Sequence, residues 1–184
     1  MAIRKVARLG HPVLRQVASE IPTNQIGHPE IQRLVVDLRD TMAEYEGVGL
    51  AAPQIFDSLR VFAMLSGLED ETVSQPPTIW INPQLAYPES EQVDGWEGCL
   101  SIPDLRGLVP RRRVVEVSGF DETGKTTCIR YEGFPAVVAQ HEYDHLEGIV
   151  FLDRMTEFSS LSFLREFERY QVSTEPDAED ETDE

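Results

Sequence analysis

The chain has 184 residues, of which 41% are hydrophobic and 27% are charged, and its formal net charge is −17. This length suits one domain with a real core, and the composition is ordinary for a globular protein. The sequence holds no run of about 18 apolar residues, so we expect no membrane association through a spanning helix. The acidic balance disfavours binding to the phosphates of nucleic acid, so we expect no direct DNA binding.

The two ends of the chain carry different signals. Residues 1–8 lack the apolar segment of a secretory signal, so the cytoplasm is the expected location. Residues 173–184 hold seven acidic residues, no basic residue and no side chain suited to a core. We therefore expect a single folded domain over residues 1–172, followed by an acidic disordered tail over residues 173–184.

The first half of the chain predicts an irregular arm over residues 1–28 and then a helix over residues 29–46. Pro29 suits a first helical position, and Gly47 is placed to end the helix. Apolar residues recur at helical spacing between them, namely Ile31, Leu34, Val35, Leu38, Met42 and Tyr45. The following segment, residues 47–54, predicts a tight loop whose small residues let the backbone approach another group closely.

The middle of the chain predicts mainly strands, because β-branched and aromatic residues gather there between turn signals. Residues 84–96 predict one or two short strands, and residues 67–77 predict a polar loop. Three successive arginines, Arg111 to Arg113, predict either a local basic patch or a solvated strand end. The other expected strands cover residues 60–66, 78–82, 113–120 and 126–131.

Two further helices are expected after these strands. One covers residues 134–147, with Pro135 in its first turn and Gly148 after its end. The other covers about residues 159–171. Strands in the middle and helices near both ends favour an α+β fold, with antiparallel strands packed around the helix over residues 134–147 and helices near the N-terminal and C-terminal ends.

The helix over residues 134–147 carries a metal-binding pattern. His141 and His145 are four residues apart, which places them on one helical face with about 5–6 Å between their Cβ atoms. Two imidazoles so placed can bind one metal ion. Glu142 lies about 100° around the helix, where its carboxylate can reach a water on that ion. This is the HExxH arrangement of two histidine ligands and a glutamate general base.

Apolar side chains precede the histidines on the same helical face. Phe134, Val137 and Val138 lie seven, four and three residues before His141. They form one apolar stripe with the histidines at its end, and so predict the wall of an apolar pocket beside the metal. The competing interpretation is a core helix with two incidental histidines.

A catalytic zinc-type site takes three protein ligands and leaves a fourth position open, so a third ligand is needed. Cys99 lies in a Gly-containing segment and would complete a Cys-His-His set. On composition alone, a buried small apolar role is the commoner one for a free cysteine. Cys128 has no ligand motif around it, and we expect it to be structural.

Three motifs, in order, give the chain a resemblance to a known family. They are residues 47–54 (GVGLAAPQ), residues 97–103 (EGCLSIP) and residues 140–148 (QHEYDHLEG). With this content and spacing the chain resembles peptide deformylase, over about residues 3–170. The resemblance implies an enzyme that removes the formyl group from the N-terminal formylmethionine of newly made polypeptides and releases formate.

The resemblance also implies roles for individual residues. Cys99, His141 and His145 would be the metal ligands, and Glu142 the acid and base. Gln54 and the backbone N–H of Leu100 would donate to the carbonyl oxygen of the formyl group. Substrate would be bound by Val48, Gly49 and Arg106, beside the apolar wall of Phe134, Val137 and Val138.

The implied cofactor is one divalent metal ion, with Fe²⁺ the expected native ion and Zn²⁺, Ni²⁺ or Co²⁺ compatible with the same ligands. The implied partners are N-formylmethionyl nascent peptides, and the ribosome is a further candidate partner. The acidic tail argues against the ribosome, since ribosomal RNA would repel it.

Two other functions fit parts of the sequence. A zincin-type metallopeptidase takes its third ligand downstream of HExxH, where Glu147, Asp153 and Glu157 lie. It would leave the motif around Cys99 unexplained. A non-catalytic structural metal-binding protein would need no Glu142 and would want a fourth ligand.

Overall fold

The computed structural model describes residues 3–65 and 76–172. The acidic tail expected over residues 173–184, and most of the loop expected over residues 67–77, lie outside these ranges. Within the described ranges the chain forms two antiparallel sheets and three α-helices. The expected fold class, antiparallel strands with helices near both ends, is confirmed at this level.

The larger sheet has five strands in the order β1-β2-β3-β6-β7. Every neighbouring pair in it is antiparallel. A register shift in β3 between Ile81 and Gln84 lets that strand continue beyond the expected end at residue 82. The strands are β1 (Gly49–Ala51), β2 (Val61–Met64), β3 (Thr78–Ala86), β6 (Val114–Phe120) and β7 (Thr126–Glu132).

The smaller sheet has three strands in the order β4-β5-β8, namely β4 (Gln92–Cys99), β5 (Ile102–Arg112) and β8 (Ser162–Phe163). Strands β4 and β5 form a hairpin that turns directly after Cys99. The sequence predicted no strand over the residues of β5, because Pro103, Gly107 and Pro110 interrupt the alternation of apolar and polar residues. Pairing with β4 on one side and with β8 on the other orders this segment.

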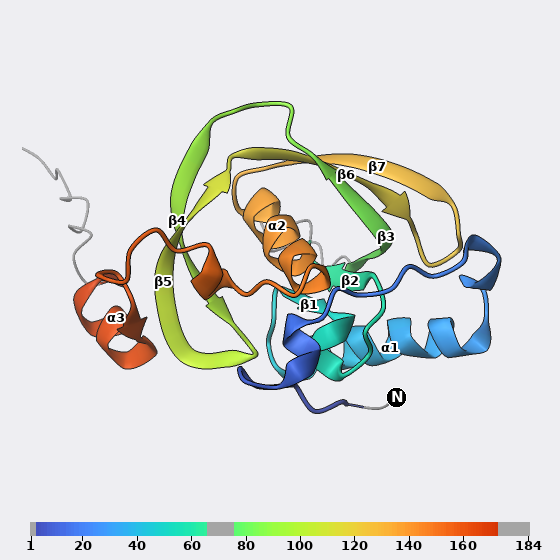
Figure 1. Ribbon diagram of the computed structural model, residues 1–184, viewed down its shortest axis with the longest axis horizontal. Helices are drawn as coiled ribbons and strands as arrows, with labels where there is room; N and C mark the ends of the chain where they lie inside the picture. The colour runs from blue at the N-terminus through green and yellow to red at the C-terminus, as the bar shows by residue number, and fades with distance from the viewer. Residues whose placement is uncertain (1–2, 66–75, 173–184) are drawn as a thin grey trace, which may run out of the picture.

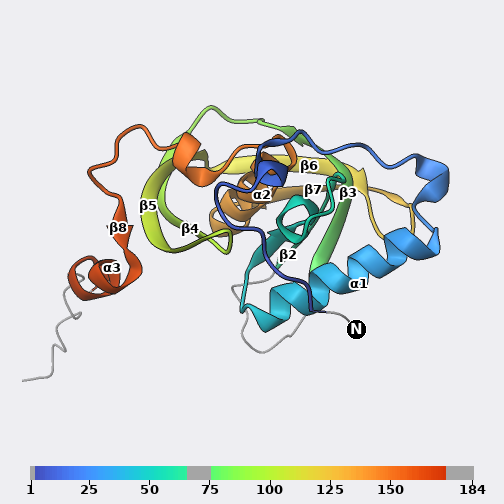
Figure 2. The same ribbon diagram turned by 60° about the horizontal axis from the view of Figure 1, so that its bottom comes forward.

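The helices are α1 (Pro29–Glu44), α2 (Phe134–Leu146) and α3 (Leu164–Tyr170). Figure 1 shows α2 at the centre of the molecule, with the β4–β5 hairpin on one side of it and β3 on the other. Helix α1 runs along the opposite side of β2, as the turned view in Figure 2 makes clear. The described residues also form four short 3-10 turns, over Pro12–Arg15, Thr23–Gln25, Ala52–Ile55 and Phe151–Asp153.

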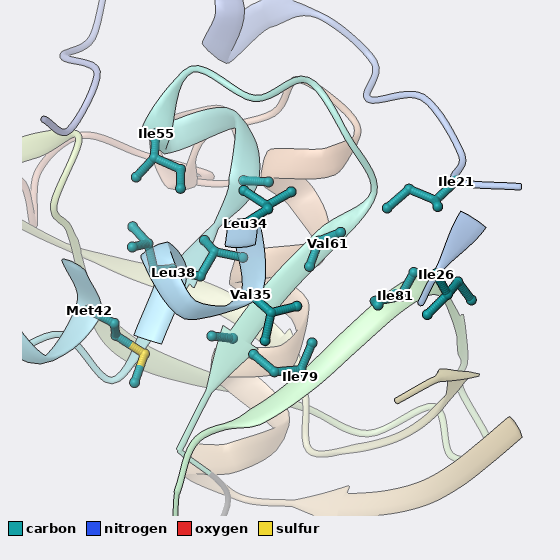
Figure 3. Close-up of a cluster of buried hydrophobic side chains, with 13 residues drawn as sticks. Ile21, Ile26, Leu34, Val35, Leu38, Met42, Ile55, Val61, Ile79 and Ile81 are labelled. Atoms are coloured by element: carbon teal, nitrogen blue, oxygen red, sulfur yellow. The ribbon is translucent and has the colours of Figure 1, made fainter. Parts of the chain in front are cut away.

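The two faces of the larger sheet bury two different sets of side chains, because neighbouring residues of a strand point to opposite faces. In β2, Val61 and Ala63 belong to the core under α1, whereas Phe62 and Met64 belong to the core under α2. Figure 3 shows the first core, in which side chains of α1 meet those of β2 and β3. Helix α2 is therefore held between this sheet and the β4–β5 hairpin.

Two further predicted elements differ from the structure. The helix expected over residues 159–171 begins at Leu164, because Ser162 and Phe163 pair with β5 instead. Part of the loop expected over residues 47–54 is strand β1, which pairs with β2 at the sheet edge. Among the described residues, no helix is long and apolar enough to cross a membrane.

Gly148 is the position at which the end of α2 meets the N-terminal arm. Its φ is +72°, and a Cβ added there would lie 2.8 Å from the backbone carbon of Arg15. The left-handed conformation alone costs about 1–2 kcal/mol for an L-residue, and the contact with backbone adds to that. We expect Gly148→Ala to lower the melting temperature by about 2–4 °C for each kcal/mol lost.

Thermal unfolding followed by circular dichroism measures this effect. Gly27→Ala is the matched control, because nothing lies within 4 Å of the added Cβ and its φ is not in the left-handed region. Equal melting temperatures for the two variants would contradict the role assigned to Gly148.

Candidate active site

The candidate ligand atoms converge between α2 and the end of β4. The ring centroids of His141 and His145 are 5.0 Å apart, and Nε2 of His145 lies 3.3 Å from Sγ of Cys99. One ligand atom from each of the three residues lies within 4.8 Å of the others, and all three residues are buried. The structure thus brings together the three residues that the sequence pointed to as ligands.

The surroundings of Cys99 favour a thiolate. Burial raises the pKa of the Cys99 thiol, but the charges and hydrogen bonds of His145 and His141 outweigh burial, so the pKa lies well below its usual value. The backbone N–H of Ser101 also donates to Sγ, at 3.4 Å. Cys128, by contrast, is an exposed free cysteine on β7, so the buried structural role expected for it is wrong.

Glu142 is the buried carboxylate beside these ligands. Burial is the main cause that raises its pKa to about 7. Its Oε2 atom is buried without a hydrogen-bond partner. Gly49 of β1 packs directly on it, and a Cβ at that position would lie 2.4 Å from Oε1 of Glu142. A glycine is therefore required there for the carboxylate to lie against β1.

His141 is oriented by Glu97, a contact that the sequence did not reveal. Nδ1 of His141 lies 2.8 Å from Oε2 of Glu97. With Nδ1–H donating to the carboxylate, Nε2 is left to face Cys99, which is the arrangement that commonly orients a metal-binding histidine. Glu97 precedes Cys99 by two residues in β4, and although the pairing with β5 shifts register between them, both side chains reach the histidines of α2.

Arg111 in turn holds Glu97. Its guanidinium donates to Glu97 at 2.6 and 3.1 Å and to Asp144 of α2 at 2.6 Å. Burial raises the pKa of Glu97, but hydrogen bonds from His141 and Arg111 outweigh it and lower the pKa to about 2. Arg111 is only 4% exposed, so for this residue both the basic patch and the solvated strand end are wrong, whereas Arg113, just after the end of β5, is partly exposed and pairs with Glu91.

The residues fit a divalent metal ion. Thiolate and imidazole are donors that suit Zn²⁺ and other late first-row ions. Burial lowers the pKa of His141, but hydrogen bonds to Cys99 and Glu97 outweigh it, and the pKa lies well above its usual value. The anionic groups thus favour positive charge between them. Nδ1 of His145 is a further buried polar atom without a hydrogen-bond partner, so this cluster is not satisfied by protein groups alone.

Gln54 lies next to Cys99 with its amide fixed in one orientation. Its Oε1 accepts from the backbone N–H of Ala51 at 2.8 Å, while its Nε2 lies 3.5 Å from Sγ of Cys99. The same nitrogen donates to Oγ of Ser101 at 3.2 Å, so the amide N–H groups lie between Ser101 and the ligand cluster. Leu100 follows Cys99 in the turn of the hairpin, and its carbonyl oxygen accepts from Arg8 at 3.0 Å.

A cavity of about 490 Å³ opens at the ligand cluster. All six residues that the sequence analysis assigned to substrate binding line it, namely Val48, Gly49, Arg106, Phe134, Val137 and Val138. Cys99, Leu100 and His141 lie at its lining as well. Trp96 and Leu164, which the sequence did not single out, come from β4 and from the start of α3.

The acidic residues required by the metallopeptidase alternative are engaged elsewhere. Glu147 pairs with Arg60 at 2.7 Å, and Asp153 pairs with Arg15, while Glu157 is exposed and outside the ligand cluster. In the described ranges, three ligand atoms converge rather than the four of a closed structural site. The geometry therefore favours an open, three-ligand centre at the mouth of a cavity.

Comparison with known proteins decides the family. The sequence model of the polypeptide deformylase family matches residues 3–160. The chain belongs to the peptide deformylase family. It is 41% identical over 172 residues to peptide deformylase 1 of Prochlorococcus marinus, covering 91% of this chain and 88% of that protein. Peptide deformylase 2 of Nostoc sp. is 40% identical over 172 residues, covering 92% and 94%.

Solved structures agree with this assignment. A class I type b peptide deformylase from Acinetobacter baumannii, solved with actinonin bound, superposes with a TM-score of 0.77 at 34% identity, covering 85% of this chain and 100% of that one. The peptide deformylase from Thermotoga maritima gives a TM-score of 0.77 at 31% identity, with the same two coverages. This deformylase is therefore a metal-dependent hydrolase that removes the N-formyl group from nascent polypeptides.

The two cysteines of this deformylase give a direct test of the ligand set. We expect Cys99→Ser to lower metal retention and turnover strongly, because a hydroxyl is a much poorer ligand than a thiolate. In Co²⁺-loaded protein, the thiolate-to-metal charge-transfer absorption should disappear as well. Cys128→Ser is the matched control, and it should change none of the three measurements. Metal retention and absorption that survive in Cys99→Ser would remove this cysteine from the ligand set.

Proposed function

We propose that Cys99, His141 and His145 hold one divalent metal ion, with α2 as the metal-binding helix, and that Glu142 moves the proton in deformylation. The observation that carries this proposal is the convergence of three buried ligand atoms beside a carboxylate oxygen that has no protein partner. A buried oxygen of this kind is costly unless a water or substrate group bonds to it. Glu142 is thus placed to act on a group that enters the cavity.

We propose that the formyl oxygen accepts hydrogen bonds from Gln54 and from the backbone N–H of Leu100. The fixed amide of Gln54 supports this assignment, because its orientation is set before substrate binds. Donors that are already oriented stabilise the charge developing on a carbonyl oxygen, and one such donor is worth about 2.7–4 kcal/mol.

The methionine side chain of the substrate would enter along α2. Phe134, Val137 and Val138 supply an apolar wall beside His141, and Val48 and Gly49 line the cavity from β1 and the residue before it. Arg106 would lie near the substrate peptide further out. The Acinetobacter baumannii deformylase has been solved with Met-Ala-Ser bound, which supports a site of this size for a short peptide product.

The chemistry of the step follows from these placements. When bound, the ion supplies Lewis acidity, which can lower the pKa of a water to about 7 and polarise the formyl carbonyl. Glu142 accepts the proton of the attacking water and then donates it to the leaving amine. The C–N bond breaks, and formate and a free N-terminal methionine are released. Gln54 and Leu100 hold the carbonyl oxygen throughout.

We propose Fe²⁺ as the native ion, with Zn²⁺, Ni²⁺ and Co²⁺ able to occupy the same ligands. The active substrate would be the N-formylmethionyl end of a nascent chain in the cytoplasm. The ribosome is a further candidate partner. The acidic tail disfavours it, because ribosomal RNA would repel the tail.

Metal analysis of protein purified without oxygen tests the choice of ion. We expect iron to be the main metal retained, and turnover of a formyl-Met peptide to fall when the iron-loaded enzyme is exposed to air. Zinc-loaded protein is the control, since Zn²⁺ is not oxidised. A zinc-loaded enzyme that is as fast as the fresh iron-loaded one would contradict Fe²⁺ as the preferred ion.

The role of Glu142 is tested by Glu142→Gln, which keeps the shape of the side chain and removes its basicity. We expect the variant to retain its metal and to lose about 10²–10⁴-fold in kcat, the range for a placed proton-transfer group. Metal content and peptide turnover are measured on the same preparation. Glu30→Gln, at an exposed position in α1, is the control. Near-normal turnover in Glu142→Gln would exclude Glu142 as the acid and base.

A further inference from the structure

The two faces of strand β4 line different parts of the cavity. Glu97 and Cys99 point toward α2 and the candidate metal ligands. Trp96, directly before Glu97, points to the other face. On that other face, Arg106 of β5 packs over Gly98, where an added Cβ would lie 2.0 Å from its guanidinium. The cavity reaches both faces, because Cys99 and Trp96 both line it.

Strand β4 also offers an edge for a peptide. In the smaller sheet, β4 pairs with β5, and among the described residues no other strand pairs with β4. An extended peptide can add to such an edge through main-chain hydrogen bonds. Gly98, over which Arg106 packs, lines the cavity at this strand.

We propose that the side chain of the second residue of the substrate packs between Trp96 and Leu164, and that the β8–α3 segment is a specificity element for an aromatic residue at that position. This inference rests on the metal site proposed above. If the formylmethionine side chain lies along α2, the next side chain of an extended peptide points to the opposite face of β4. That face presents Trp96, Arg106 and Leu164.

The position of Leu164 is fixed by two contacts. Strand β8, directly before it, pairs with Leu105 and Arg106 of β5. The ring of Phe167, one turn later in α3, lies against Trp96, with ring centroids 4.7 Å apart and planes inclined by 58°. Figure 2 shows β8 and α3 beside β5, at the end of the molecule away from α1. This segment lies beyond residues 3–160, the range that the family's sequence model matches.

The chemistry of this subsite favours an aromatic side chain. Trp96 and Leu164 offer apolar surface, and an aromatic ring gains from contact with another ring. The guanidinium of Arg106 also lies on this face, where it would attract the face of an aromatic ring and repel a lysine. Since Trp96, Arg106 and Leu164 are all only partly buried, the subsite is open, and the gain should be moderate.

Three peptides that differ only at the second residue test the proposal: formyl-Met-Phe-Ser, formyl-Met-Ala-Ser and formyl-Met-Lys-Ser. We expect kcat/KM of the metal-loaded enzyme to be about 3- to 10-fold higher for the Phe peptide than for the Ala peptide, the range of one aromatic contact. The Lys peptide should be the slowest of the three. The Phe-to-Ala ratio is independent of the active fraction of a preparation, so partial unfolding cannot imitate the effect.

In Leu164→Ala and in Phe167→Ala, the Phe-to-Ala ratio should fall toward one, with the change in KM rather than kcat. Phe163→Ala is the matched control, because Phe163 is 67% exposed and does not line the cavity; it should keep the wild-type ratio. A wild-type ratio of one, or a ratio unchanged in Leu164→Ala, would overturn the subsite. A metal-loaded wild type that hydrolyses none of the peptides would instead overturn the active site on which the subsite depends.

Discussion

The buried guanidinium of Arg111 is the contact on which the arrangement of the site depends. It extends from β5 and binds Glu97 of β4 and Asp144 of α2, so it joins the hairpin that carries Cys99 to the helix that carries both histidines. Glu97 in turn orients His141. Removing one partner of such a buried set leaves an uncompensated charge, which costs about 3–5 kcal/mol. The ligand geometry therefore depends on groups that bind no ligand themselves, and Arg154 completes the set by binding Asp144 from a partly exposed position.

Close packing of backbone around α2 is the second condition for the site. Gly49 allows β1 to lie against Glu142, and Gly107 allows β5 to lie against Met155. Gly98 does the same for the guanidinium of Arg106 on the other face of the hairpin. A methyl group at any of these positions would enter a neighbouring side chain. The consequence of the contact is greatest at Gly49, because the Glu142 side chain is buried, whereas the ends of Arg106 and Met155 are flexible.

The acid–base properties of the centre follow from this packing. Burial in the closed space between β1 and α2 is what raises the pKa of Glu142, while the paired histidines lower that of Cys99. One carboxylate is thus made a stronger base, and the thiol is made an anion, within the same cluster. This difference suits a hydrolase that must hold a cation on one group and move a proton with another.

The sequence by itself determined the local features of this protein. Helical spacing placed His141, His145 and Glu142 correctly on one helix, and the apolar periodicity of α1 located that helix to within two residues of its end, because both patterns depend only on neighbouring residues. Three motifs sufficed for the family. The tertiary structure decided the features that depend on distant segments. Strand β5 contains prolines and a glycine that argue against a strand, and the residues of β8 continue a helical pattern, yet the two strands pair with each other. Arg111 is buried because its partners, 14 and 33 residues away in the sequence, meet it in the fold. Ion pairing and strand pairing are set by which surfaces meet in the fold, and a single sequence does not encode that locally.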